Sequence, residues 1–220
     1  GQNPPPSMPA MNDELIGVCE VEEDDEMVLV TVDGYSIRFA CAEVRAMGRS
    51  ATGVKGIALR KGDQVVAGVV ISRDTKQELL TVAENGYGKR TQVGQFRAQT
   101  RGGKGVINMR ITPKTGKVVG AMMVHPTDEL ILLTSGSKII RIGIASISLV
   151  GRAAQGVRLV RLEDDQTVIC FDHVPTETAE TSTTSGGGVF EEGGGLLDDT
   201  ADDGFLADGF RDGGDDDEEG

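Results

Sequence analysis

Short apolar runs and turn dipeptides recur along this chain in a pattern that repeats three times. Each repeat opens with an apolar run that leads into a turn with glycine in its second position. The opening runs are residues 26–32, 78–82 and 129–134, and the turns are Asp33-Gly34, Asn85-Gly86 and Ser135-Gly136. Asp-Gly or Asn-Gly between two apolar runs is the strongest short-range signal for a β-hairpin. Each repeat is therefore predicted to begin with two antiparallel strands.

A glycine-rich element and two further apolar runs follow each predicted hairpin. The elements span residues 48–54, 100–106 and 151–157, and the runs span 57–59 and 65–71, then 106–111 and 118–124, then 157–162 and 167–174. Four short strands in a unit of about fifty residues are typical of a propeller blade. The predicted fold class is all-β, a propeller-like array of four-stranded blades with units near 26–75, 76–127 and 128–174. Helical periodicity is weak at 42–47 and 93–98, where we expect loops.

The two ends of the chain differ from the repeats. Residues 14–21 form an apolar run that matches the closing strand of a preceding unit, so 14–174 is interpreted as part of a longer array. Residues 1–13 are Pro-rich and polar, which predicts a linker. Residues 175–220 are rich in Thr, Gly and Asp and are predicted to be a disordered acidic tail, because they cannot bury enough apolar surface to offset the entropy of ordering. The Phe and Leu residues scattered in this tail leave open that it docks on another surface.

Charge is segregated along the chain, so the net charge of −13 is a misleading average. The segment 176–220 has fifteen acidic residues and one basic residue, Arg211. The segment 76–124 instead has nine basic and two acidic residues, a net charge of +7. A basic middle within an acidic chain is the asymmetry that a function must explain.

Residues with catalytic potential do not form a recognisable motif. His125 and His173 lie at the ends of predicted strands, and Cys170 is expected to point to the opposite face of its strand from His173. No spacing completes a metal site, and no P-loop is present. Cys19, Cys41 and Cys170 are far apart and predict buried thiols in a reducing cytoplasm. We expect no catalytic, metal or cofactor site here, and no membrane span, because no apolar run approaches about 18 residues.

Basic residues recur with the period of the repeat. Arg38, Arg90 and Arg141 are 52 and 51 residues apart, and Arg49, Arg101 and Arg152 have the same spacings. Equivalent positions on successive blades form a stripe, and a stripe of cations follows a polyanion. With 4% aromatic residues and no Trp, base stacking is disfavoured and contact with a duplex backbone is favoured. The predicted DNA contacts are Arg38, Arg49, Lys89, Arg90, Arg97, Arg101, Lys104, Arg141 and Arg152.

One glycine-rich element carries a family resemblance. Gln99-Thr100-Arg101-Gly102-Gly103-Lys104-Gly105 resembles the gyrase A box, QRRGGRG in its usual form, with Gly102, Gly103 and Gly105 as motif glycines. The stretches 84–91 and 151–159 also resemble the C-terminal domain of the gyrase A protein of bacterial DNA gyrase, which is a type IIA topoisomerase. The resemblance covers residues 14–174, but Thr100 stands where the box has Arg. This copy therefore looks like a degenerate box from a later blade.

The resemblance implies a β-pinwheel, in which blades exchange strands and duplex DNA wraps around a basic rim. In such an enzyme ATP-driven strand passage introduces negative supercoils, and wrapping must offset a bending cost of about 1–6 kcal/mol. The chain would then be a non-catalytic fragment, with the catalytic Tyr and the sites for ATP and Mg²⁺ elsewhere in the enzyme. Its implied partners are duplex DNA, the rest of gyrase A, and gyrase B, in an A2B2 complex in the bacterial cytoplasm. The acidic tail is expected to temper wrapping by competing for the same cations.

Three alternatives stay open from the sequence. The C-terminal domain of the A-type subunit of topoisomerase IV resembles this chain in its blade type, and an intact box upstream would separate the two. A kelch-like protein-binding propeller has units of about 50 residues, but these blades lack the Gly-Gly and Trp features expected there. The simplest alternative is a solvated surface whose charge follows the repeat.

Overall fold

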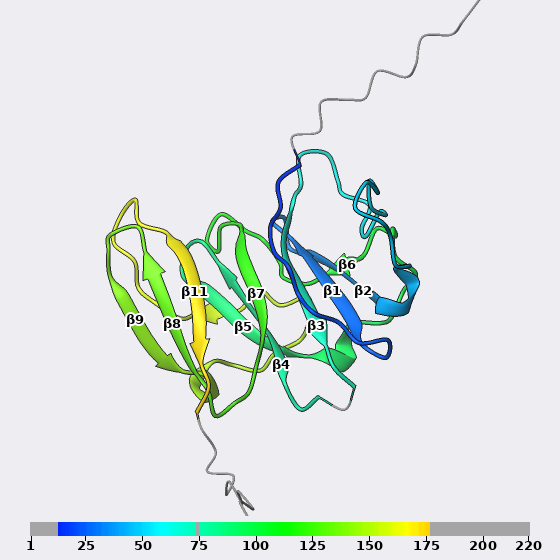
Figure 1. Cartoon of the computed structure of the whole chain (residues 1–220). Helices are drawn as coiled ribbons and strands as arrows, with labels where there is room; N and C mark the ends of the chain where they lie inside the picture. Colours follow the sequence, from blue (N-terminus) through cyan, green and yellow to red (C-terminus); the bar gives the residue numbers. More distant parts are fainter. Residues whose placement is uncertain (1–12, 74, 177–220) are drawn as a thin grey trace, which may run out of the picture. The chain divides into compact units, whose positions relative to one another are not determined.

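The computed structural model describes residues 13–73 and 75–176, which form three antiparallel β-sheets (Figure 1). The first sheet has the strand order β3 (Val65–Ile71), β1 (Glu26–Thr31), β2 (Tyr35–Ala40) and β6 (Val106–Ile107). The second has the order β10 (Val157–Arg158), β5 (Tyr87–Gln92), β4 (Glu78–Ala83) and β7 (Val118–Val124). The third has the order β11 (Val168–Val174), β8 (Glu129–Thr134) and β9 (Ile139–Gly143). The all-β fold class is confirmed.

The predicted hairpins form the centre of each sheet. β1 pairs with β2, β4 with β5 and β8 with β9, each through five residue pairs in antiparallel register. Gly34 and Gly86 have φ angles of 79° and 76° at the first two turns. Only glycine takes this left-handed conformation without steric cost, which is why Asp-Gly and Asn-Gly mark these positions. At the third turn, Ser137 takes the left-handed conformation instead, with φ of 59°.

Neighbouring repeats exchange their outermost strands. β6 belongs to the second repeat but pairs with β2 of the first, with Tyr35 opposite Ile107. β10 belongs to the third repeat but pairs with β5 of the second, with Arg158 opposite Tyr87. The first two sheets therefore reach four strands only with a strand from the next repeat, which confirms the strand exchange that the resemblance implied.

The second sheet is packed between the other two through strand β4. Leu79 belongs to a buried cluster with Val28 and Val69 of the first sheet. Leu80, the next residue, belongs to a second buried cluster with Leu130 of the third sheet. Successive side chains of a strand point to opposite faces, so a strand buried on both faces needs a nearly continuous apolar sequence. The run Leu79-Leu80-Thr81-Val82-Ala83, all buried, meets that requirement.

Several sequence predictions about local structure are wrong. Residues 14–21 form no strand, although 16–19 lie against β1 and β3 across an apolar hollow of about 340 Å³. Residues 57–59 form no strand either. The expected loops after β2 and β5 each begin with a short 3-10 helix, η1 (Cys41–Glu43) and η2 (Val93–Gln95), and η3 (Ile144–Ser146) follows β9. Such residues have little helical signal because one turn is too short to show periodicity.

The cysteines are only partly as expected. Cys41 is buried, and burial raises the pKa of its thiol. Cys19 and Cys170 are exposed, which corrects the prediction that all three are buried. Neither the linker predicted at 1–13 nor the tail predicted at 175–220 can be assessed, because all but Asp13, Pro175 and Thr176 lie outside the described residues. Within the described ranges, no helix is long and apolar enough to cross a membrane.

The second glycines of the first and third glycine-rich elements provide a matched test of strand exchange. Gly53 and Gly156 have similar φ angles of 80° and 82°, but a Cβ at Gly156 would lie 2.6 Å from the Gly88 carbonyl oxygen, whereas one at Gly53 meets nothing within 4 Å. Gly53→Ala should lower the free energy of unfolding by about 1 kcal/mol through backbone strain alone. Gly156→Ala should cost about 1–3 kcal/mol more, because the backbones approach too closely for a methyl group. Urea unfolding measures both values, and equal losses would contradict the close approach.

Candidate nucleic-acid interface

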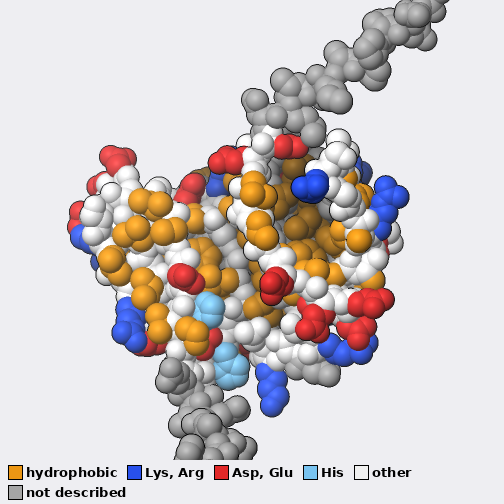
Figure 2. Space-filling view, viewed as in Figure 1, with side chains coloured by type: hydrophobic (Ala, Val, Ile, Leu, Met, Phe, Trp, Pro, Cys, Tyr) orange, Lys and Arg blue, Asp and Glu red, His pale blue; other side chains and the backbone are white. Residues whose placement is uncertain are grey.

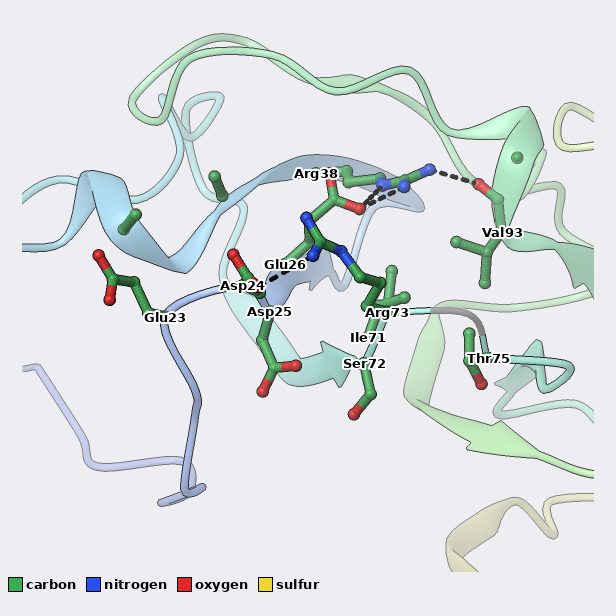
Figure 3. Close-up of a pocket in the computed structure, with 13 residues that line it drawn as sticks. Glu23, Asp24, Asp25, Glu26, Arg38, Ile71, Ser72, Arg73, Thr75 and Val93 are labelled. Atoms are coloured by element: carbon green, nitrogen blue, oxygen red, sulfur yellow. Dashed lines mark hydrogen bonds and ion pairs between the residues drawn. The ribbon is translucent and has the colours of Figure 1, made fainter.

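In the first two sheets, the arginine near the end of the hairpin fastens its sheet to the next repeat. Arg38 on β2 forms an ion pair with Glu26 on β1, with its Nε 2.9 Å from the Glu26 carboxylate. Its Nη1 donates to the carbonyl oxygen of Val93 at 3.1 Å (Figure 3) and to that of Phe96 at 3.1 Å, around η2 of the second repeat. The Phe96 backbone N–H already donates to the Val93 carbonyl oxygen at 3.0 Å, so the guanidinium is a second donor there, and it also supplies a donor to the Phe96 carbonyl oxygen at the end of the turn.

Arg90 repeats this arrangement one sheet further along. Its Nη1 donates to the Glu78 carboxylate at 2.7 Å, and its Nε donates to the Ile147 carbonyl oxygen at 2.8 Å. Nη2 lies 3.4 Å from the carbonyl oxygen of Ala145, in η3. Only 10% of the Arg90 side chain is exposed, so its charge is held inside the junction between the second and third repeats.

A second arginine crosses each junction in the opposite direction. The Arg101 backbone N–H donates to the Glu43 carboxylate at 3.0 Å, and its guanidinium donates to the carbonyl oxygens of Glu43 and Lys55 at 3.1 and 3.2 Å. The Arg152 backbone N–H donates to the Gln95 side-chain oxygen at 2.9 Å, and its Nη1 donates to the Ile107 carbonyl oxygen. We call these four residues the junction arginines: Arg38 and Arg101 at the first junction, and Arg90 and Arg152 at the second.

Lys89 is the clearest correction to the predicted contacts. Its side chain is fully buried, and its Nζ donates to the carbonyl oxygens of Asn108, Gly151 and Arg152 at 2.6, 3.0 and 2.6 Å. All three ammonium hydrogens therefore have partners within the protein. Burial and the nearby Arg152 charge lower the pKa of Lys89 to about 8. Lys89 holds the third glycine-rich element in place and is not available to DNA in this structure.

The motif glycines also have a packing role. The Gly102 backbone N–H donates to the Gly56 carbonyl oxygen, and the Gly103 carbonyl oxygen accepts a hydrogen bond from the Ala58 backbone N–H at 2.8 Å. At Gly105, with φ of 67°, a Cβ would overlap the Ser36 carbonyl group. These glycines let the second glycine-rich element pass between segments of the first repeat.

The remaining predicted contacts differ in their surroundings. Arg49, Arg97 and Lys104 are exposed. Arg141 is the third copy of the hairpin arginine, but it contacts only Glu129, which raises its pKa, and 60% of its side chain is exposed. The third sheet thus lacks the junction that buries Arg38 and Arg90, because the described residues contain no further repeat to pack against β9.

A set of exposed cations that the sequence analysis missed lies on or beside the exchanged strands β6 and β10, in the turn that carries Lys114, and in the segment that precedes β3. These residues are Lys55, Arg60, Arg110, Lys114, Arg158 and Arg161, and together with Lys104 we call them the outer-edge cations. Arg110 and Arg161 are 51 residues apart and each follows an exchanged strand, so the repeat spacing could have identified them. Within the described residues, no ion pair engages any outer-edge cation. Figure 2 shows Lys and Arg side chains mainly at the margins of the face that it presents.

The end of the first sheet opposite its hairpin turn has the opposite charge. A hollow of about 630 Å³ is lined by Glu23, Asp24 and Asp25 together with Arg38 and Arg73 (Figure 3). Arg73 donates to the Asp24 carboxylate at 3.0 Å, and Arg38 is occupied as described above. Carboxylates dominate this hollow, so it does not suit phosphate. Among the described residues, no cluster of three His, Cys, Asp or Glu side chains could hold a metal ion.

Comparison with known proteins assigns this architecture. The family model described as DNA gyrase C-terminal domain, beta-propeller, matches residues 25–72, 77–125 and 128–169. The gyrase A protein of DNA gyrase from Lawsonia intracellularis is 51% identical over 164 residues, which is 74% of this chain and 20% of that protein. Its counterpart from Staphylococcus aureus (strain MRSA252) is 44% identical over 169 residues, or 77% of this chain and 19% of that protein. The chain thus spans about a fifth of the length of these relatives.

Two solved structures share the fold. The C-terminal domain of DNA topoisomerase IV aligns with a TM-score of 0.65 and 28% identity, over 69% of this chain and 47% of that one. A DNA gyrase A C-terminal domain aligns with a TM-score of 0.64 and 28% identity, over 70% of this chain and 52% of that one. The β-pinwheel predicted from the resemblance is therefore confirmed.

The junction can be tested with two arginines at equivalent repeat positions. Arg90→Ala leaves the largely buried Glu78 carboxylate and the buried Ile147 carbonyl group without this donor, which should lower the free energy of unfolding by about 3–5 kcal/mol. Arg141→Ala removes an exposed ion pair and should cost less than about 1 kcal/mol. Urea unfolding of the two variants measures the difference. Similar losses at the two positions would contradict the assignment of Arg90 to the junction.

The lowered pKa of Lys89 predicts a pH dependence of stability. In the folded chain Lys89 loses its proton near pH 8, whereas in the unfolded chain it does so near its ordinary value of 10.5. Between these values the unfolded state binds more protons, so raising the pH stabilises the folded state. The free energy of unfolding relative to Lys89→Met should be constant below pH 8 and rise by about 2–3 kcal/mol toward pH 10.5. A constant difference across this range would mean that the three carbonyl groups offset the effect of burial.

Proposed function

Because the chain belongs to the DNA gyrase C-terminal domain family, we propose that its blades bind the backbone of duplex DNA along the outer-edge cations, independently of base sequence. The observation that carries this proposal is that the second and third repeats present exposed cations, Arg110 and Arg161, at equivalent positions after their exchanged strands, and no ion pair engages them in the described part of the chain. Phosphate contacts of this kind position a duplex but carry no sequence information.

Wrapping follows from the repeat. Cations on successive blades contact successive stretches of the phosphate backbone, so a duplex that follows a curved series of blades is bent. Bending a site of 20–30 base pairs costs about 1–6 kcal/mol, which several phosphate contacts must offset. In the whole protein, wrapping would present one DNA segment for strand passage and so support ATP-dependent negative supercoiling.

The partners and cofactors of the whole protein belong to this proposal. We propose that the chain works as part of gyrase A, joined to gyrase B with two copies of each, in the bacterial cytoplasm. ATP, Mg²⁺ and the catalytic Tyr act elsewhere in that complex. Family membership removes the kelch-like alternative, and the likeness to the topoisomerase IV C-terminal domain supports the same duplex-binding surface.

Salt dependence of duplex binding tests the proposal. Fluorescence anisotropy with duplexes of unrelated sequence should give equal affinities that fall steeply with salt. Replacing Lys104, Arg110, Arg158 and Arg161 together by Ala should reduce the slope of log K against log salt by about 3–4, since each lost phosphate contact contributes about 0.9. Arg73→Ala with Lys76→Ala, near the acidic hollow, is the control and should leave the slope unchanged. An unchanged slope in the fourfold variant would contradict the proposal that the outer-edge cations contact DNA.

Removal of the acidic tail tests its proposed influence on wrapping. Residues 177–220 carry a net charge of −14 and compete for the same cations in this proposal. A chain ending at residue 176 should bind duplex DNA more tightly and, when a nicked circle is sealed in its presence, should give a larger change in linking number per bound protein. Ligation of nicked circles in its presence measures the linking number. Equal values with and without the tail would show that the tail does not temper wrapping.

A further inference from the structure

Tyr87 lies where the exchanged strand of the third repeat meets the hairpin of the second. In the β5–β10 pairing, Tyr87 and Arg158 occupy directly opposite positions. The Arg158 guanidinium donates to the Tyr87 hydroxyl oxygen from Nη2 at 3.1 Å and from Nε at 3.3 Å. Tyr87 is 6% exposed, whereas Arg158 is exposed. The buried phenol therefore fixes the orientation of an exposed cation.

A second cation reaches the same ring from another segment. The Nζ of Lys114 lies 5.5 Å from the centre of the Tyr87 ring, within the range of a cation–π interaction. The turn that carries Lys114 is held by Asn85, whose side-chain amide lies 3.2 and 3.4 Å from the carbonyl oxygens of Pro113 and Lys114. Two cations from different repeats are thus gathered on one aromatic side chain, and both lower the pKa of its hydroxyl, Arg158 mainly through its hydrogen bonds.

The other sheets do not assemble this pair. In the first sheet the equivalent Tyr35 faces Ile107 across the exchanged strand, and its cation, Arg60, lies over the ring face at 3.2 Å from the ring centre. In the third sheet Lys138 occupies the position and forms an ion pair with Glu163. Only the second of the three described sheets combines a phenol with two cations.

The hollow beside Arg158 and Lys114 is lined by cations on one side and by an acidic turn on the other. Lys114, Arg158 and Arg161 line a hollow of about 420 Å³, which the acidic turn Glu163–Asp165 also lines. Glu163 is engaged by Lys138 and accepts a hydrogen bond from Gln166 at 3.0 Å. Asp164 and Asp165 are exposed and accept no hydrogen bond among the described residues. An anion would therefore be attracted to the Arg158 side and repelled by the acidic turn.

We propose that Arg158 and Lys114 form a phosphate subsite for one phosphodiester of a duplex backbone, and that Tyr87 is the residue that positions Arg158 in it. The proposal rests on the proposed function, because the phosphate is supplied by DNA bound along the outer edge. Arg158 meets the phosphate oxygens with the N–H groups that Tyr87 leaves free, and Lys114 adds a second charge. The hydroxyl of Tyr87 contributes orientation and no direct contact with the phosphate.

A double-mutant cycle on duplex affinity tests this assignment in the full-length chain. Arg158→Ala should weaken binding about five- to tenfold at 0.1 M salt and reduce the salt slope by about 0.9. Tyr87→Phe keeps the ring and the charge of Arg158 but removes the hydroxyl, so it should weaken binding two- to threefold with the slope nearly unchanged. In the Arg158→Ala background, Tyr87→Phe should have no further effect, because there is no guanidinium left to orient and the ring that faces Lys114 is kept.

Matched variants separate positioning from general effects on the fold. Tyr35→Phe should not change binding, because Arg60 contacts the ring face and not the hydroxyl. Replacing Asp164 and Asp165 by Asn should tighten binding, because it removes the repulsion within the hollow. Thermal unfolding of each variant, together with the NMR signal of the Arg158 Nε–H, reports whether the fold and the guanidinium orientation are retained.

The outcomes distinguish the two proposals. If the unmodified chain does not bind duplex DNA even at low salt, the proposed function fails. If it binds and Arg158→Ala weakens binding, but the effects of Tyr87→Phe and Arg158→Ala are additive, the subsite stands without Tyr87 as its positioning residue and the inference is overturned. If neither Arg158→Ala nor Lys114→Ala changes the affinity of a chain that binds, the phosphate subsite itself is wrong.

Discussion

The architecture depends on hydrogen bonds to backbone carbonyl oxygens where one repeat meets the next. Each repeat turns out of its hairpin through a single 3-10 turn, and the last carbonyl groups of such a turn have no backbone donor within it. Arg38 and Arg90 supply donors there from the preceding sheet, and Arg101 and Arg152 reach back in the other direction. Guanidinium groups suit this task because they offer several fixed donors and stay charged when buried. The repeat of arginines is thus required by the way the sheets are joined.

This requirement divides the cations into two groups with different tasks. Lys89 and Arg90 have their N–H groups directed at protein oxygens and are buried, so they are not free for a polyanion, and the other junction arginines have part of their donors engaged in the same way. Most outer-edge cations lie on or after the exchanged strands, where one side of a two-residue strand faces solvent, and Lys55 and Arg60 lie in the segment before β3. Strand exchange therefore does two things: it closes each four-stranded sheet, and it carries the cations of one repeat to the edge of its neighbour.

Much of the fold can be predicted from the sequence, whereas the division of the cations cannot. Alternating apolar runs and Asp33-Gly34 or Asn85-Gly86 turns are local signals, and they identify the hairpins. Repeat spacing shows which residues are equivalent but not which partners they meet, so it does not separate Arg90 from a surface residue. In the equivalent strands of the other two repeats, the position of Lys89 is occupied by Ile37 and Ile140. Apolar residues at these equivalent positions indicate that the position is buried. The strand predicted at 14–21 lacks the partner strands that would define it.

The most direct measurement is a lysine acetylation footprint of the full-length chain, with and without duplex DNA at low salt, read by mass spectrometry. Lys104 and Lys114 on the outer edge should react freely and be protected when DNA is bound. Lys76, near the acidic hollow, should react equally in both states, and the buried Lys89 should react in neither. Protection of Lys76 with no protection of Lys104 and Lys114, or a Lys89 that reacts freely until DNA is added, would contradict the division between junction and outer-edge cations.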